Sequence, residues 1–148
     1  MEIELLEMLR TVEALKGVPK RVFADILMDC IFCHLDRSIL AETKLSCTVP
    51  DSYPVSKGHS LVVPKRHVAS IWEMTEEEYT DAFALVRHVK ELLQEQFRPE
   101  GFNIGVNCGE AAGQSVFHAH IHIIPRYTGD VPNPRGGVRN IIPGKGNY

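Results

Sequence analysis

Three histidines at alternate positions, His118, His120 and His122, are the densest group of chemically active side chains in the chain. In an extended strand, alternate side chains project from the same face, so this spacing predicts that the three imidazoles line one side of a strand. The residues between and beside them are apolar, which indicates that the opposite side packs against a core. A single histidine is usually structural, whereas three in register indicate a site.

Two kinds of chemistry fit this row of imidazoles. Same-face neighbours on a strand lie about 6.6 Å apart, so two of them could share a zinc ion with ligands from elsewhere. A neutral imidazole can also attack phosphorus and form a phospho- or nucleotidyl-histidine that water later hydrolyses. Residues 109–115, which precede the row, supply small side chains, an amide and a hydroxyl suited to phosphate oxygens. This segment favours the second chemistry.

Composition narrows the class of protein. The chain has 148 residues, of which 44% are hydrophobic and 24% charged, as expected for one folded domain. A net charge of -3 argues against duplex nucleic acid as a partner but allows a small phosphorylated ligand. Three glutamates among the first seven residues are unlike a secretory signal, and no apolar run has membrane-spanning length. We therefore expect a cytoplasmic protein without a membrane partner.

Periodicity predicts the elements that position the row. Residues 2–16 have the spacing of an amphipathic helix, and a second, shorter helix is expected up to about residue 29. Thr75 and Glu78 have the form of a capping box, followed by one long helix up to Phe97. Strands are predicted over residues 46–49, 60–63, 102–107 and 116–124, and residues 126–148 contain too many glycines and prolines for regular structure. Strands with one long helix indicate an α+β fold on an antiparallel sheet.

The segment around the row resembles a known family. Residues 113–126, GQSVFHAHIHIIPR, closely resemble the signature of the histidine triad (HIT) family of nucleotide hydrolases and transferases. Segments similar to those of prokaryotic HIT proteins also occur at residues 30–33 (CIFC), 51–59 (DSYPVSKGH), 64–67 (PKRH) and 134–139 (PRGGVR). The resemblance covers residues 30–148 in order. We therefore expect a HIT domain over residues 30–148, preceded by a helical extension over residues 1–29.

The resemblance implies a HIT-like α+β fold with a five-stranded antiparallel sheet, and a homodimer with two-fold symmetry. It also implies attack on the α-phosphate of an adenine nucleotide derivative, a dinucleoside polyphosphate or a nucleoside phosphoramidate, with release of a nucleoside monophosphate. His120, the middle histidine, would be the nucleophile, with His122 at the phosphoryl oxygens and His118 in support. His122 favours the hydrolase branch, because the uridylyltransferase-like branch has glutamine at this position.

Further residues take roles from the same resemblance. Ser115 and Gln114 match donors near the phosphate and the leaving group, so Ser115 is also counted with the catalytic residues. Asn107 matches a residue that contacts phosphate, and Asp51 matches the carboxylate that binds ribose hydroxyls. The nucleotide-binding set is then Asp51, Asn107, Gln114, Ser115, His120 and His122.

Cys30 and Cys33 have the spacing of half a zinc site. An isolated C-x-x-C pair also fits thiols in a core or a redox role, and these alternatives stay open. In prokaryotic HIT proteins with this motif, the histidine after Pro-Lys-Arg and the first histidine of the triad complete a tetrahedral site. His67 and His118 hold these positions here. Such a closed Cys₂His₂ set leaves no open coordination position, so the Zn²⁺ would be structural.

Two other functions compete with a nucleotide hydrolase. In a non-catalytic nucleotide-binding or adaptor protein, the triad and the zinc would persist while partner contact is the function. In a zinc hydrolase, the triad itself would hold a catalytic metal. The zinc hydrolase is disfavoured because the cysteines offer a better place for metal and no general-base carboxylate stands beside the row.

Overall fold

The computed structural model of the chain describes residues 30–35 and 38–147. The helices predicted over residues 1–29 lie outside the described residues. The chain divides into two compact units, Met1–Leu35 and Asp36–Tyr148, and each is described by itself. The second unit contains all the strands and helices described below.

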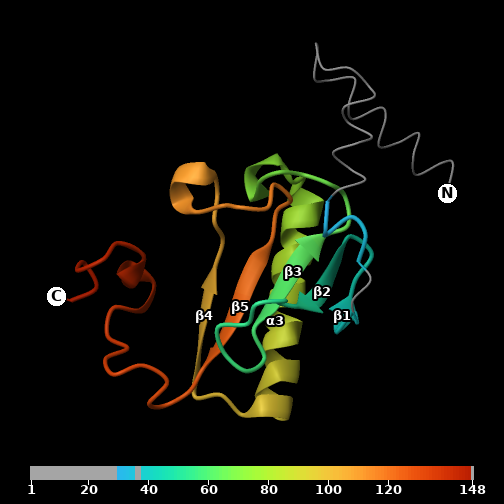
Figure 1. The fold of residues 1–148 in the computed structure, drawn as a ribbon. Helices are drawn as coiled ribbons and strands as arrows, with labels where there is room; N and C mark the ends of the chain where they lie inside the picture. The colour runs from blue at the N-terminus through green and yellow to red at the C-terminus, as the bar shows by residue number, and fades with distance from the viewer. Residues whose placement is uncertain (1–29, 36–37, 148) are drawn as a thin grey trace, which may run out of the picture. The chain divides into compact units, whose positions relative to one another are not determined.

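A five-stranded antiparallel sheet forms the centre of the second unit, which confirms the expected α+β architecture. Its strands follow the spatial order β1-β2-β3-β5-β4, so β5 lies between β3 and β4 (Figure 1). The strands span Ala41–Glu42 (β1), Ser46–Pro50 (β2), Ser60–Pro64 (β3), Gly101–Gly105 (β4) and Ile121–Arg126 (β5). Periodicity did not predict β1, because two residues are too few to show an alternating pattern.

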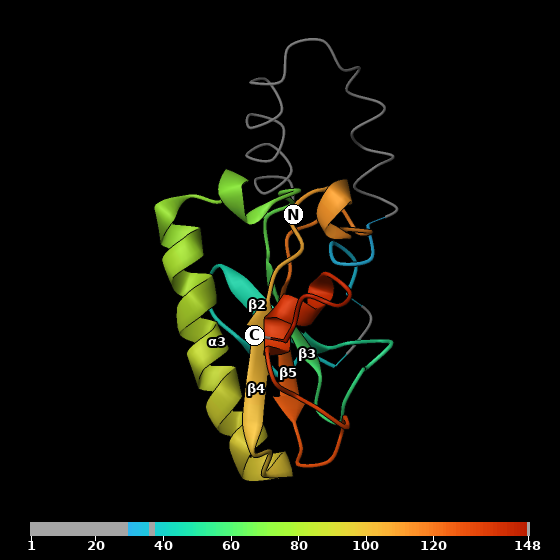
Figure 2. The ribbon, with the colours of Figure 1, turned by 90° about the vertical axis from the view of Figure 1, so that its left-hand side faces the viewer.

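One long helix, α3 (Glu76–Phe97), runs along one face of this sheet (Figures 1 and 2). The predicted capping box is present: the Glu78 N–H donates to the Thr75 hydroxyl, and the Glu78 carboxylate accepts the Thr75 N–H. The apolar face of α3 packs on side chains of β3 and β5. This core consists of Val62, Ala82, Leu85, Val86, Val89, Leu93, Ile121 and Ile123. None of the helices in the described part of the chain has the length and apolar character to cross a membrane.

Strand β5 carries the last histidine of the row and faces two environments. Ile121 and Ile123 are buried in the core beneath α3. His122 alternates with them and pairs with Leu61 of β3, so it lies on the face of the sheet that α3 does not cover. The core side of the strand thus fixes where His122 points.

The prediction of one strand over residues 116–124 was wrong at its beginning. The ladder between β3 and β5 starts only at the Val62–Ile121 pair, and His118 and His120 precede it in irregular backbone. Before the ladder, the Ala119 N–H donates to the carbonyl of Val68, outside β3. The residues before Ile121 therefore lie beside the loop that follows β3 and not beside β3 itself. As a result, the three histidines do not share one strand face.

Short 3₁₀ helices complete the unit: η1 (Ile71–Glu73), η2 (Glu110–Ala112) and η3 (Gly137–Ile141). The segment after β5 is mostly irregular, as predicted, although η3 interrupts it. It passes alongside β4 (Figure 1), where Gly137 approaches the side chain of Asn103. Strand β4 ends at Gly105, two residues earlier than periodicity predicts.

Candidate active site

The structure brings the last two histidines of the row side by side. The ring centroids of His120 and His122 lie 5.1 Å apart, with the rings nearly perpendicular. His120 is 7% exposed and His118 is fully buried, whereas the side chain of His122 is 20% exposed. The exposed fraction rises along the row, so His122 lies at its solvent-accessible end.

The backbone determines which nitrogen of His120 carries its proton. His120 Nδ1 lies 2.8 Å from the carbonyl oxygen of His118. A carbonyl can only accept a hydrogen bond, so Nδ1 must be the protonated nitrogen. Neutral His120 then has its lone pair on Nε2, which is the form that a nucleophilic imidazole requires.

His118 has the opposite arrangement. Its Nε2 lies 2.8 Å from the carbonyl oxygen of Pro64 and is the donor there. The lone pair is therefore on Nδ1, which lies 3.2 Å from Nδ1 of His67. Two ligands of a tetrahedral zinc ion with bonds of 2.0–2.1 Å are separated by about 3.3 Å. Burial lowers the pKa of His118 to about 4 and also lowers that of His67, so both rings are neutral, as metal ligands must be.

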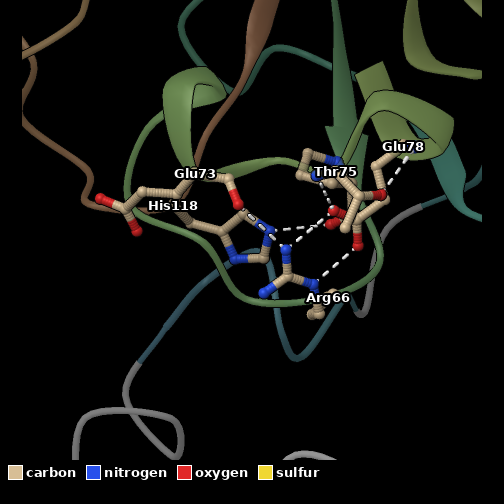
Figure 3. Close-up of polar contacts among 6 residues, drawn as sticks. Arg66, Glu73, Thr75, Glu78 and His118 are labelled. Carbon is tan, nitrogen blue, oxygen red and sulfur yellow. Dashed lines mark hydrogen bonds and ion pairs between the residues drawn. The ribbon is translucent and has the colours of Figure 1, made fainter. Parts of the chain in front are cut away.

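Polar contacts of Arg66 with Glu73 and Glu78 (Figure 3) anchor the segment beside His67. The Arg66 guanidinium donates from Nε and Nη2 to the two carboxylate oxygens of Glu78, at 2.7 and 2.8 Å, and Nη2 also reaches the carbonyl of Glu73. Glu78 is at the same time the capping-box residue of α3. This bidentate pair ties the residue beside His67 to the first turn of the helix and holds the pKa of the Glu78 carboxyl below its usual range.

Gln114 holds together the loop before the histidines. Its side-chain oxygen accepts the N–H of Gly109 at 2.8 Å, and its amide nitrogen donates to the carbonyls of Ala69 and Val116 at 2.6 and 3.1 Å. Gln114 is 6% exposed. In this structure its carboxamide positions the loop, whereas the neighbouring Ser115 is exposed to solvent.

Replacing Gln114 by glutamate is expected to lower stability by about 2 kcal/mol, because a carboxylate cannot donate to the two carbonyls that the amide nitrogen reaches. Thermal unfolding of the two proteins measures this loss. Gln96→Glu, at an exposed position of α3, is the matched control and should unfold as the parent does. Equal effects at both positions would show that the loop does not depend on the Gln114 carboxamide.

A second group of side chains surrounds His122. His59 Nε2 lies 2.9 Å from His122 Nδ1. Asp51 Oδ2 lies 3.5 Å from the same His59 nitrogen and 3.9 Å from His122 Nδ1. His59 is buried, and the Asp51 side chain is 15% exposed. The sequence places Asp51 among the site residues, whereas for His59, directly after the Gly58 turn, it leaves a structural brace and a functional role equally open.

The pKa values of this group predict an acid-sensitive fold. Burial lowers the pKa of His122 to about 4 and also lowers that of His59, whereas an unfolded histidine titrates near about 6.5. Between these values the unfolded chain binds protons that the native chain does not. The free energy of unfolding is therefore highest above pH ~6.5 and decreases as the pH falls toward ~4. His122 alone contributes up to about 3 kcal/mol of this loss.

Thermal midpoints measured across that pH range test the expectation. The variant His122→Asn should flatten the decline, whereas His88→Asn, at an exposed position of α3, should leave it unchanged. A decline as steep in His122→Asn as in the parent would contradict the assignment.

The remaining predicted residues lie in separate places. Asn107 is exposed two residues after the end of β4.

In the first unit, Cys30 and Cys33 lie in a tight turn, where the Cys33 N–H donates to the Cys30 carbonyl at 3.1 Å. Burial, together with the neighbouring Cys30 side chain, raises the pKa of the Cys33 thiol to about 12. A cation beside such thiols would reverse this effect and favour thiolates.

Known proteins resemble the chain in sequence. Residues 34–129 match the model of the HIT domain. Adenosine 5'-monophosphoramidase hnt1 of Schizosaccharomyces pombe is 41% identical over 116 residues, which cover 75% of this chain and 80% of that protein. An asymmetrical bis(5'-nucleosyl)-tetraphosphatase of the same organism is 40% identical over 92 residues, covering 62% of this chain and 50% of that protein.

Solved structures agree with these relatives. A HIT family protein of Bacillus anthracis superposes with a TM-score of 0.66 at 38% identity, covering 69% of this chain and 76% of that one. A zinc-bound histidine triad family protein of Mycobacterium smegmatis superposes with a TM-score of 0.65 at 31% identity, covering 70% of this chain and 79% of that one. From its domain match, its relatives and its fold, the chain belongs to the HIT family.

Proposed function

We propose that the protein is a nucleotide hydrolase that cleaves at the α-phosphate of a nucleoside phosphoramidate or a dinucleoside polyphosphate. The observation that carries this proposal is the hydrogen bond from His120 Nδ1 to the His118 carbonyl, because it leaves the lone pair on Nε2. Relatives named for an adenosine monophosphoramidase and for a nucleosyl tetraphosphatase support these two classes of substrate, and the first name also supports the expected adenine nucleotide.

The proposed reaction has two steps. In the first, His120 Nε2 attacks the α-phosphorus, a P–N bond forms, and the bond to the leaving group breaks as that group takes up a proton from solvent. In the second, water attacks the same phosphorus and gives up a proton to solvent, the P–N bond breaks, and a nucleoside monophosphate leaves with His120 neutral again. The His118 carbonyl stabilises the positive charge that develops on the His120 ring. No metal takes part in this scheme.

Other residues would bind the nucleotide. Asp51 would accept hydrogen bonds from ribose hydroxyls, and Asn107 and Ser115, both exposed, would donate to phosphate or leaving-group oxygens. His122 would contact the phosphoryl oxygens. Gln114 would act through the loop that it holds rather than by touching the nucleotide.

Cys30, Cys33, His67 and His118 would bind one structural Zn²⁺. The set offers two sulfur and two nitrogen ligand atoms, a combination that zinc prefers. Within the second unit, the lone pair of His118 Nδ1 lies 3.2 Å from His67 Nδ1, a separation that fits two ligands of one ion as well as a hydrogen bond between the rings. The zinc-bound neighbour from Mycobacterium smegmatis supports it independently. The ion would hold the segment of His118 in place without taking part in the reaction.

Three expectations stay predictions: the homodimer, the domain boundary at residue 30 and the cytoplasmic location.

For the homodimer, one edge of the sheet is available as a pairing surface, since strand β4 lies at the end of the strand order. An edge strand offers backbone groups for pairing with a second copy. The mass of the chain in solution would show whether two copies associate.

A panel of adenosine phosphoramidates and dinucleoside polyphosphates, incubated with the pure protein and resolved by chromatography, tests the function. We expect adenosine monophosphate as a product from at least one class. Binding of nucleotide without any turnover would instead support the non-catalytic nucleotide-binding or adaptor protein.

A further inference from the structure

The contacts of His59 determine its own protonation. Its Nδ1 lies 3.2 Å from the backbone nitrogen of Val55, and a backbone N–H can only donate, so Nδ1 must carry the lone pair. Burial lowers the pKa of His59, so the ring is neutral. The single ring proton of neutral His59 is therefore on Nε2.

This proton points toward His122. His59 Nε2 lies 2.9 Å from His122 Nδ1 and 3.5 Å from Asp51 Oδ2, so the hydrogen bond goes to the ring. His122 Nδ1 accepts this bond and cannot itself be protonated. A neutral His122 then carries its proton on Nε2, at the other end of the ring.

The surrounding loop holds His59 in place for this contact. The His59 N–H donates to the Ser56 carbonyl, and the His59 carbonyl accepts the Asp51 N–H, at 3.1 and 3.0 Å. Gly58, with φ of 89°, lies so close to α3 that a Cβ there would come within 2.8 Å of the Phe97 ring. The ring of His59 is therefore fixed by a tightly packed loop.

We infer that His59 is a positioning residue that sets the tautomer of His122, making His122 Nε2 a hydrogen-bond donor toward the phosphoryl oxygens. The inference rests on the proposed function for its consequence in catalysis. A neutral donor at this end of the row would stabilise the negative charge that spreads over those oxygens in the transition state. The row would then combine a lone pair at His120 Nε2 with an N–H at His122 Nε2.

Asp51 explains why a separate residue is needed for this task. Its carboxylate lies 3.9 Å from His122 Nδ1. Without His59, this acceptor would attract a proton onto His122 Nδ1 and leave a lone pair on Nε2, the wrong form for a donor. His59 prevents this change of tautomer, because its Nε2–H donates to Nδ1 of His122.

A metal ion is the competing explanation, since ligand atoms of Asp51, His59 and His122 lie within 4.8 Å of one another. A metal on His59 Nε2 would require the ring proton to move to Nδ1, where it would oppose the N–H of Val55. The Val55 contact therefore favours a hydrogen bond over a metal in this group.

The test compares two substitutions that each keep part of His59. In His59→Gln, the side-chain amide reaches as far as Nε2 and can still donate to His122. In His59→Asn, the shorter amide can serve Val55 but cannot reach His122. Long-range ¹⁵N–¹H correlation spectra of the full chain with ¹⁵N-labelled histidine report which ring nitrogen is protonated, and loss of signals in His122→Asn assigns that ring.

In the parent protein at neutral pH, we expect His122 to be protonated on Nε2. His59→Gln should keep this form, and His59→Asn should shift it toward Nδ1. With a substrate that is turned over, His59→Asn should lower kcat about tenfold or more with a smaller change in KM, and His59→Gln should recover most of the loss. His88→Asn controls for the loss of a histidine elsewhere.

A parent spectrum with His122 protonated on Nδ1, or the same His122 tautomer in both His59 variants, would overturn the inference. If His59→Asn does not fold, the parent spectrum still decides. If no substrate is turned over, the proposed function fails, while the spectra continue to test the His59 contact by themselves.

Discussion

Replacing His120 by alanine is expected to abolish turnover and to leave nucleotide binding nearly intact. In the proposed reaction, His120 Nε2 forms a bond to phosphorus. His118 has no lone pair on the corresponding nitrogen, because its Nε2 donates to the Pro64 carbonyl. Losing a covalent nucleophile removes stabilisation of the transition state and leaves ground-state contacts in place. The expected loss in kcat is on the order of 10³-fold or more.

Steady-state kinetics and equilibrium binding of a nucleoside monophosphate measure the two effects separately. A brief quench of the parent protein with labelled substrate should trap the nucleotide on the chain, and His120→Ala should trap none. Turnover of His120→Ala near the parent rate would exclude His120 as the nucleophile. His88→Ala, far along the exposed side of α3, controls for removing an imidazole.

Several parts of the fold could be predicted because their signals are local. The capping box of Thr75 and Glu78 depends on two residues three positions apart, and the structure shows both of its hydrogen bonds. The apolar periodicity of α3 identified most of the face that packs on β3 and β5, but it also included Tyr79 and Phe83, which are exposed, and missed Leu85, which is buried. The five-stranded sheet came from the family resemblance, and its two-residue strand β1 has no pattern of its own.

The parts that could not be predicted depend on contacts between distant segments. The start of β5 is set by where β3 stops being its neighbour, and alternation of side chains does not encode that point. Gln114 had the sequence position of a phosphate donor, but its carboxamide bonds to Ala69, in a loop that is far away in sequence. The sequence leaves Arg66 open between a solvated charge and one that steers phosphate, whereas in the structure it pairs with Glu78 in the first turn of α3. Gln114 and Arg66 both bond to residues that are distant in sequence, and no local pattern identifies such partners.

The zinc proposal predicts the largest change in stability. Purified parent protein is expected to contain near one equivalent of zinc, and Cys33→Ser is expected to lose it, because a serine hydroxyl is a poor ligand where a thiolate is required. A ligand bound 1,000-fold above its dissociation constant stabilises the native state by about 4 kcal/mol. For a chain of this length the thermal midpoint should therefore fall by about 10 °C.

Two comparisons separate loss of the metal from loss of a thiol. Cys108→Ser changes a partly buried cysteine that packs beside Val68 and Ile71, and it should keep the zinc content of the parent. A strong chelator should lower the midpoint of the parent and of Cys108→Ser toward that of Cys33→Ser, and should leave Cys33→Ser itself unchanged. Activity should fall only with stability, since the proposed ion would hold His118 and would take no part in the attack by His120. Parent protein without zinc, in which Cys30 and Cys33 both react readily with a thiol reagent while the chain is folded, would contradict the site and leave the two cysteines as ordinary thiols.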